Sequence, residues 1–265
     1  CTVHLSLRDG WHLDVDRGQG CCRATLSCGP GVMDEQERLH RLAVAAADLV
    51  QPGMIVGLGT GSTASAVVEE LGRRVATGLN MTGVVTSDRT GELARSLGIP
   101  LAELDEVAAL DLGLDGADEI DPQLNAVKGR GGALLMEKLV ALSCAQFVLV
   151  ASSEKSVAQL GVRLPLPVEV VRFGWKHTAN RLESLGLKPR LRLISAVDAS
   201  PYITDQGNYI LDCGPSPISH PEDLAAKIKS TPGVVEHGLF VGIASAALQV
   251  DPDGNVLYRT RDSIA

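Results

Sequence analysis

Two phrases of the sequence bring together residue types that could perform chemistry. L-D-G-A-D-E-I-D (residues 114–121) places Asp115, Asp118, Glu119 and Asp121 at the end of an apolar run. V-K-G-R-G-G-A-L-L-M-E-K (residues 127–138) follows. It contains a lysine, a glycine loop and one glutamate inside an apolar segment. A glutamate near the start of a buried helix that faces a cleft is a plausible general base. The two phrases therefore make this region the first candidate for a catalytic site.

The glutamate in question is Glu137. On a helix its i±3 and i±4 neighbours are apolar, so no basic residue offers it an exposed helical ion pair. Lys138 is surrounded in the same way, so periodicity does not decide which of the two faces a cleft. A surface charge, or a core charge with a satisfied partner, remains an alternative interpretation of Glu137.

The acidic phrase also has simpler explanations. Asp-Gly and Asp-Pro are common turn formers, so the carboxylates could serve turns alone. Magnesium binding is another alternative, although the spacing is not that of an EF-hand loop and no histidine is near.

A third phrase, G-L-G-T-G-S-T (residues 57–63), is typical of an anion-binding turn. Its glycines allow a tight turn, the following helix offers free N–H groups, and the hydroxyls of Thr60, Ser62 and Thr63 can add donors. The dinucleotide pattern G-x-G-x-x-G would need glycine at position 62, and the lysine of a P-loop is missing. A phosphate on a small molecule fits better than NAD or ATP, and a purely structural turn stays open.

The elements that must position these phrases alternate in type. Apolar runs at 54–59, 83–88, 110–115 and 147–151 predict strands, and helices are predicted from Asp34, from the T-G-S-T turn through Leu71, over 90–98 and from near Gly132. Asp34 and Glu37 have capping-box spacing. Nearly continuous apolar strands that alternate with helices predict an α/β fold: a Rossmann-like open parallel sheet with helices on both faces. Ligands of such sheets bind beyond the carboxyl ends of the strands, where all three phrases fall.

After Pro165 the pattern changes to a smaller α+β domain. L-P-V-E-V-V, R-L-R-L-I-S and Y-I-L-D-C are predicted strands, and helices are predicted at 175–186 and 221–230. We therefore expect a leader at 1–32, a Rossmann-like catalytic domain made of 33–164 and 236–265, and a small domain at 165–235. The tail from Gly238 could return to the first sheet.

Composition limits the class of protein. The chain has 265 residues, 45% hydrophobic content and a net charge of −8, which argues against a basic nucleic-acid surface. No run of about 18 apolar residues predicts a membrane span. Four of the six cysteines lie in the first 28 residues and none has zinc spacing, which favours a reducing, intracellular setting. Residues 1–32 lack an evident period and a signal-peptide core, so we expect a disordered or non-native leader, with Met33 as a natural start.

Taken in order, these phrases resemble one family. G-x-G-T-G-S-T, D-G-A-D-E-[IV], K-G-[GR]-G-[AG]-x-x-x-E-K, S-x-K and L-P-V-E-V together look like type A ribose-5-phosphate isomerase, from residue 33 to about 260. The resemblance implies interconversion of D-ribose 5-phosphate and D-ribulose 5-phosphate through an enediolate, in the non-oxidative pentose phosphate pathway. It implies no metal and no organic cofactor, a phosphosugar as the partner, a homodimer or homotetramer, and a cytoplasmic location. No nucleic acid and no membrane are expected as partners.

The resemblance also implies roles for residues of this sequence. Glu137 would move the proton between C2 and C1, and Lys128 with the loop amides would stabilise the enediolate. Asp115 and Asp118 would hold sugar hydroxyls and help to open the ring, with Asp115 favoured as the proton carrier. Arg130 stands where bacterial members often have glycine, so only its backbone can serve as the glycine did. The implied substrate-binding residues are Thr60, Gly61, Ser62, Thr63, Asp115, Gly116, Ala117, Asp118, Lys128, Gly129, Arg130, Gly131 and Lys155.

Two alternatives are weighed against this function, a related phosphosugar enzyme and a protein of a different, non-catalytic class. An amino-sugar phosphate isomerase/deaminase would bind a related anion, but D-G-A-D-E with K-G-R-G-G argues against it. A non-catalytic phosphosugar sensor usually carries a helix-turn-helix, and residues 1–32 contain nothing like one. Turnover of ribose 5-phosphate would separate all three.

Overall fold

The structure is a computed structural model that describes residues 2–6, 11–18, 21–28, 33–195 and 197–261. Its centre is a six-stranded sheet with the strand order β16-β15-β9-β6-β4-β5. All neighbours in it are parallel except the pair β15–β16, which is antiparallel. The strands are β4 (Ile55–Leu58), β5 (Thr82–Val85), β6 (Leu110–Asp115), β9 (Cys144–Ser152), β15 (Ala246–Val250) and β16 (Val256–Thr260). The predicted parallel sheet and the return of the tail to it are confirmed.

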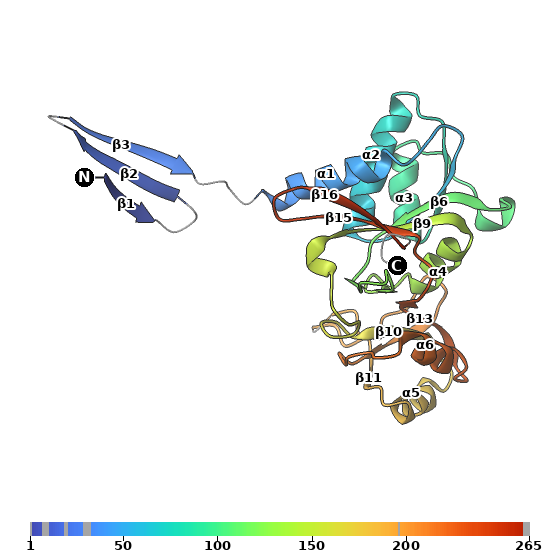
Figure 1. Cartoon of the computed structure of the whole chain (residues 1–265). Helices are drawn as coiled ribbons and strands as arrows, with labels where there is room; N and C mark the ends of the chain where they lie inside the picture. The colour runs from blue at the N-terminus through green and yellow to red at the C-terminus, as the bar shows by residue number, and fades with distance from the viewer. Residues whose placement is uncertain (1, 7–10, 19–20, 29–32, 196, 262–265) are drawn as a thin grey trace.

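Helices cover both faces of this sheet, as predicted. α1 (Glu35–Ala47) and α2 (Ser62–Ala76) pack on one face, where Leu42, Leu71 and the alternate strand residues form the largest core cluster. α3 (Asp88–Ser96) packs beside α2. α4 (Leu134–Leu142) lies on the opposite face (Figure 1). The capping-box prediction for α1 is wrong in one respect, because Asp34 is the N-cap residue but its side chain accepts no hydrogen bond there.

The smaller unit is an antiparallel sheet with the order β11-β12-β10-β13. Its strands are β10 (Leu166–Val170), β11 (Pro189–Leu191), β12 (Tyr209–Cys213) and β13 (Val234–His237). α5 (Trp175–Ser184) and α6 (Pro221–Lys229) close a core of their own with it. β11 is shorter than the predicted R-L-R-L-I-S strand, since the chain leaves the ladder after Leu191 and returns only as bridges near Pro201 and Ile203. β13 extends this sheet to His237, slightly past the expected boundary.

A third sheet, which the sequence did not predict, connects the two units. It has the order β14-β8-β7, with β7 at Glu119–Ile120, β8 at Ala126–Val127 and β14 at Leu239–Phe240. Strands of two residues have no period to detect, so the pattern of the sequence could not show them. β7 and β8 carry the acidic phrase and the start of the lysine-glycine loop. This sheet therefore sets where both phrases lie. Short 3₁₀ turns occur at Leu104–Glu106 and Ser153–Lys155.

The leader contains three antiparallel strands that pair with one another: β1 (Thr2–Ser6), β2 (Trp11–Gly18) and β3 (Cys21–Cys28). Figure 1 shows them apart from the rest of the chain. No alternation was expected here, yet His12-Leu13-Asp14-Val15-Asp16 alternates polar and apolar residues over one short stretch. Within the part of the chain that is described, no helix is long and apolar enough to span a membrane.

Candidate active site

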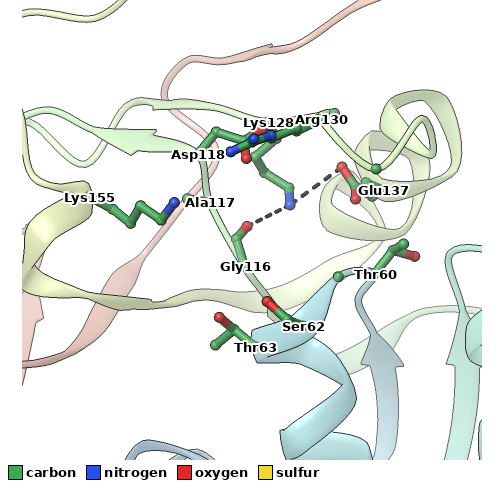
Figure 2. Close-up of a pocket in the computed structure, with 13 residues that line it drawn as sticks. Thr60, Ser62, Thr63, Gly116, Ala117, Asp118, Lys128, Arg130, Glu137 and Lys155 are labelled. Carbon is green, nitrogen blue, oxygen red and sulfur yellow. Dashed lines mark hydrogen bonds and ion pairs between the residues drawn. The ribbon is translucent and has the colours of Figure 1, made fainter. Parts of the chain in front are cut away.

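The predicted site residues gather around one pocket of about 320 Å³ at the carboxyl ends of β4 and β6 (Figure 2). Three segments wall it: the turn before α2, the acidic phrase after β6, and the loop between β8 and α4. Lys155, after β9, closes one end. The lining residues are Thr60, Gly61, Ser62, Thr63, Gly116, Ala117, Asp118, Lys128, Gly129, Arg130, Gly131, Glu137 and Lys155. Each of them was singled out from the sequence.

A buried lysine between two carboxylates lies at the inner wall of the pocket. The Lys128 Nζ is 3.0 Å from the Asp115 Oδ2 and 3.4 Å from the Glu137 Oε2. It also donates to the carbonyl oxygen of Gly116 at 2.6 Å, as Figure 2 shows. Both carboxylate oxygens are buried, and neither accepts a hydrogen bond of good geometry from the residues that the structure describes. Both oxygens therefore interact with the Lys128 ammonium group mainly through charge.

Burial and charge shift the pKa values of all three groups. Burial raises the pKa of Glu137 to about 8, although Lys128 opposes the shift. Burial likewise raises the pKa of Asp115, again against the pull of Lys128. Burial disfavours the charged form of Lys128, but Asp115 and Glu137 outweigh it and raise the lysine pKa above its ordinary value. The cluster therefore holds a charged lysine between two carboxyl groups whose pKa values are both raised by burial.

The two aspartates of the acidic phrase are placed differently. Asp118 lines the pocket, and its Oδ2 accepts a hydrogen bond from the Arg130 backbone at 3.0 Å. Asp115 is only 2% exposed and does not line the pocket. Its Oδ1 accepts from the backbone N–H groups of Thr60 and Gly116. Asp115 thus lies behind the pocket wall beside Lys128, whereas Asp118 lies at the wall itself.

The remaining acidic residues of this segment have structural partners: Asp121 serves a turn, and Glu119 holds a distant loop. Glu119 is fully buried, and its carboxylate accepts from the backbone N–H groups of Gly161, Arg163 and Leu164. Asp121 accepts from the backbone N–H of Asn125 and closes the turn before β8. No group of three or more His, Cys, Asp or Glu residues in the described ranges could hold a metal ion.

The glycine-rich turn leads directly into α2, whose first residue is Ser62. Ser62 and Thr63 line the pocket at the N-terminus of this helix, where the first N–H groups have no helical acceptor. Lys155 faces the same end of the pocket (Figure 2), and its amino group pairs with no carboxylate among the residues described. A helix N-terminus, two hydroxyls and an unpaired ammonium group make this end suitable for an anion.

Thr60 differs from its expected role as a hydroxyl donor to the ligand. Its Oγ1 lies 2.7 Å from the Thr86 hydroxyl and 2.8 Å from the Ser87 hydroxyl. The side chain is thereby held in a cluster of hydroxyls behind the pocket, which the sequence analysis missed. Beside it, a Cβ at Gly59 would overlap the carboxylate of Asp115, so glycine is needed there for the turn to lie against the acidic phrase.

The structure separates Glu137 from Lys138. Glu137 faces the pocket, whereas the Lys138 Nζ donates to the Glu236 carboxylate at 2.8 Å and to the carbonyl oxygen of His237 at 2.5 Å. Burial lowers the pKa of Lys138 to about 8. The ammonium groups of Lys138 and Lys128 lie 5.0 and 5.4 Å from the centre of the Phe240 ring. Lys138 is therefore a link between α4 and β13 and not a pocket residue.

Comparisons with known proteins agree on one family. The model of ribose 5-phosphate isomerase A (phosphoriboisomerase A) matches residues 82–254, more than half of the chain. A ribose-5-phosphate isomerase A from Synechococcus sp. (strain JA-3-3Ab) is 55% identical over 214 residues, which are 80% of this chain and 92% of that protein. One from Roseiflexus castenholzii is 53% identical over 233 residues, which are 87% of this chain and 99% of that protein.

Solved structures show the same likeness. The ribose 5-phosphate isomerase A of Methanocaldococcus jannaschii superposes with a TM-score of 0.80 at 34% identity, over 86% of this chain and 100% of that chain. A D-ribose-5-phosphate isomerase described in complex with phospho-erythronic acid superposes with a TM-score of 0.82 at 36% identity, over 86% of this chain and 100% of its own.

Proposed function

Because the chain belongs to the ribose 5-phosphate isomerase A family, we propose that it interconverts D-ribose 5-phosphate and D-ribulose 5-phosphate through an enediolate. The observation that carries the proposal is the buried Glu137 carboxylate in the pocket wall, 3.4 Å from the ammonium group of Lys128. Moving a proton from C2 to C1 requires a base at the carbon and a positive charge at the neighbouring oxygen. This pair supplies both.

Glu137 is the base in this proposal. A carboxylate of ordinary pKa is a weak base for a carbon acid, and burial raises the pKa of Glu137 to about 8. The ionised fraction near neutral pH is then small, but each ionised carboxylate is a stronger base. The protonated Glu137 then returns its proton to C1 on the same face of the enediolate, so one residue serves both steps.

Lys128 and the loop amides of Gly129 and Gly131 stabilise the developing oxyanion. Asp115, 3.0 Å from the Lys128 Nζ, keeps the lysine protonated and fixed in position. Asp118, which lines the pocket, is the better placed aspartate for contact with the sugar hydroxyls and for ring opening. This assignment reverses the order of the two aspartates expected from the sequence.

The phosphate group occupies the other end of the pocket, at the N-terminus of α2, with Ser62, Thr63 and Lys155. With its phosphate held at this end, the sugar chain extends along the pocket toward Glu137. A family member described in complex with phospho-erythronic acid supports the proposal, since that ligand is a phosphorylated sugar acid whose carboxylate resembles the oxygens of an enediolate.

NMR of ribose 5-phosphate with the protein in D₂O tests the reaction. We expect ribulose 5-phosphate to form, with solvent deuterium at C1 and a fraction of internal transfer from C2. Absence of turnover would overturn the isomerase proposal and would leave the sensor alternative. Release of ammonia from an amino-sugar phosphate would instead indicate the deaminase.

We propose in addition a cytoplasmic role in the non-oxidative pentose phosphate pathway and an assembly of two or four identical chains. Both rest on the family. Light scattering coupled to size exclusion measures the assembly directly, and a mass of one chain at micromolar concentration would contradict it.

A further inference from the structure

An arginine of the small sheet reaches the wall of the pocket. Arg192 directly follows β11, and its guanidinium donates twice to the Asp212 carboxylate of β12, at 2.9 Å through Nε and 2.5 Å through the second terminal nitrogen. The remaining terminal nitrogen donates to the carbonyl oxygens of Gly129 and Arg130, both at 3.0 Å. The Arg192 side chain is 14% exposed. The guanidinium therefore links the small sheet to the backbone of the loop that follows Lys128.

These contacts fix the direction of two peptide groups. In a trans peptide the C=O and the N–H point in opposite directions. The Gly129 carbonyl points to Arg192, and the N–H of the same peptide, on Arg130, donates to Asp118 at 3.0 Å on the pocket side. The Arg130 carbonyl also points to Arg192. The N–H of Gly131 therefore points away from Arg192, to the side of the pocket.

This N–H is available for a ligand. Gly131 lines the pocket, and its N–H donates to no group within the described ranges. A Cβ at Gly131 would meet only the Thr60 methyl group, at 3.5 Å, so the space in front of it is open. Gly131 is exposed at the pocket wall, so its N–H can bond to water in the empty pocket and to an oxygen of the substrate when the pocket is filled.

Tyr202 supports the same loop from the same side. Its hydroxyl donates to the Gly131 carbonyl at 3.2 Å, and the Arg192 guanidinium lies 5.9 Å from the centre of its ring. The backbone N–H of Tyr202 donates to the Arg192 carbonyl at 2.9 Å. Gly132 has φ +89°, and a Cβ there would overlap the Tyr202 ring, so the close approach requires glycine. Three successive carbonyls of the loop are thus held from the small sheet.

We propose that Arg192, held by Asp212, is a positioning residue that orients the Gly131 N–H toward the sugar oxygen on which negative charge develops. The inference rests on the proposed function but assigns a task to a residue outside the pocket lining. It gives the small domain a part in the reaction, since three of the groups that hold the loop belong to it: Arg192, Asp212 and Tyr202. No motif of the sequence points to this arginine.

Kinetics of Arg192→Ala and Arg192→Lys test the proposal. A misplaced oxyanion donor should lower kcat less than a deleted donor does, for which losses of roughly 10²–10³ in kcat are usual. We expect kcat of Arg192→Ala to fall about 10- to 100-fold while KM changes less than about threefold. Guanidinium ion added to Arg192→Ala should restore part of kcat. Arg192→Lys should remain well below wild type, because an ammonium group cannot hold Asp212 and two carbonyls together.

Ligand binding gives a readout that is independent of turnover. The dissociation constant of phospho-erythronic acid should rise in Arg192→Ala by about the factor lost in kcat/KM, whereas that of inorganic phosphate should stay unchanged. Arg190→Ala is the matched control, since Arg190 is an exposed arginine on β11 and should behave as wild type. If Arg192→Ala does not fold, Asp212→Asn, which loosens the arginine without removing it, takes its place with the same expected pattern.

Three results would overturn the proposal while the isomerase activity of the wild type still stands. The first is an Arg192→Ala or Asp212→Asn enzyme with wild-type kcat. The second is a defect seen only in KM and matched by weaker phosphate binding. The third is a loss of kcat that parallels a fall in melting temperature and that guanidinium does not restore at any concentration tested.

Discussion

Replacing Glu137 by glutamine removes the proposed base while keeping the shape of the side chain. Glutamine cannot accept the C2 proton, so kcat should fall by roughly 10²–10⁴, the usual worth of a positioned general base. KM should change little, because the amide occupies the space of the carboxylate and one oxygen remains to accept from Lys128. In the wild type, kcat/KM should rise with pH up to about 8, where Glu137 becomes ionised.

The same substitution should stabilise the fold at high pH. The pKa of Glu137 is raised from 4.5 to about 8 in the folded chain. Between these values the folded state holds a proton that the unfolded state has lost, so the free energy of unfolding falls as the pH rises through this window. At about 1.36 kcal/mol per pKa unit the loss reaches at most about 5 kcal/mol above pH 8. Glutamine has no charge to bury and escapes this penalty.

Urea unfolding of both proteins from pH 5 to pH 9 measures the effect. The two free energies of unfolding should be close at pH 5 and should diverge in favour of Glu137→Gln as the pH rises. The negative charge of Asp115 contributes to the raised pKa of Glu137, so part of the gain depends on that charge. Glu69→Gln, on the exposed side of α2, is the matched control and should show no divergence. A Glu137→Gln enzyme that keeps most of its kcat, or that is less stable than wild type at pH 9, would refute the reasoning.

Four further predictions follow from the structure. Lys155→Ala should raise KM for ribose 5-phosphate about tenfold or more with a smaller loss of kcat, since remote binding energy also serves the transition state; an unchanged KM would place the phosphate elsewhere. Lys138→Ala should leave kcat near that of wild type but lower the free energy of unfolding by about 1–3 kcal/mol, because Glu236 loses its buried partner and keeps the exposed Lys229; a crippled kcat in a stable protein would contradict the assignment. A chain that starts at Met33 should match the full chain in melting temperature and kcat, and a large fall in either would show that the leader contributes. Activity should survive dialysis against EDTA, and a loss that magnesium or manganese restores would turn the aspartates of the pocket into metal ligands.

The sequence was sufficient for the sheet and for the lining of the pocket. The strands of the main sheet are short, nearly continuous apolar runs, and such runs have few alternative structures when helices alternate with them. The pocket residues lie in short motifs of unusual composition. These motifs, together with the family resemblance, were enough to predict which residues line the pocket. Lys128 and Glu137 are nine residues apart, and one loop and one helical turn bring them together.

The roles of several individual side chains depend on contacts between distant segments, which the sequence pattern does not reveal. Glu137 and Lys138 have the same apolar neighbours on α4, and only the position of Glu236, about 100 residues later, decides which one is the link to β13. Arg192 directly follows β11 in a segment that looks ordinary in sequence, and its task depends on the loop 62 residues before it. The hydroxyl of Thr60 is held by Ser87 and its neighbours, which no spacing within the turn could show.

The third sheet makes the activity depend on the last part of the chain to be made. β14 pairs with β8, and the N–H of Lys128 donates to the carbonyl oxygen of Gly238 at 2.8 Å. A nascent chain that ends before Gly238 already contains every residue that lines the pocket, yet it lacks the strand against which Lys128 is aligned. During synthesis on the ribosome the motifs are therefore complete long before they can act, and the appearance of activity reports that the C-terminal segment has docked.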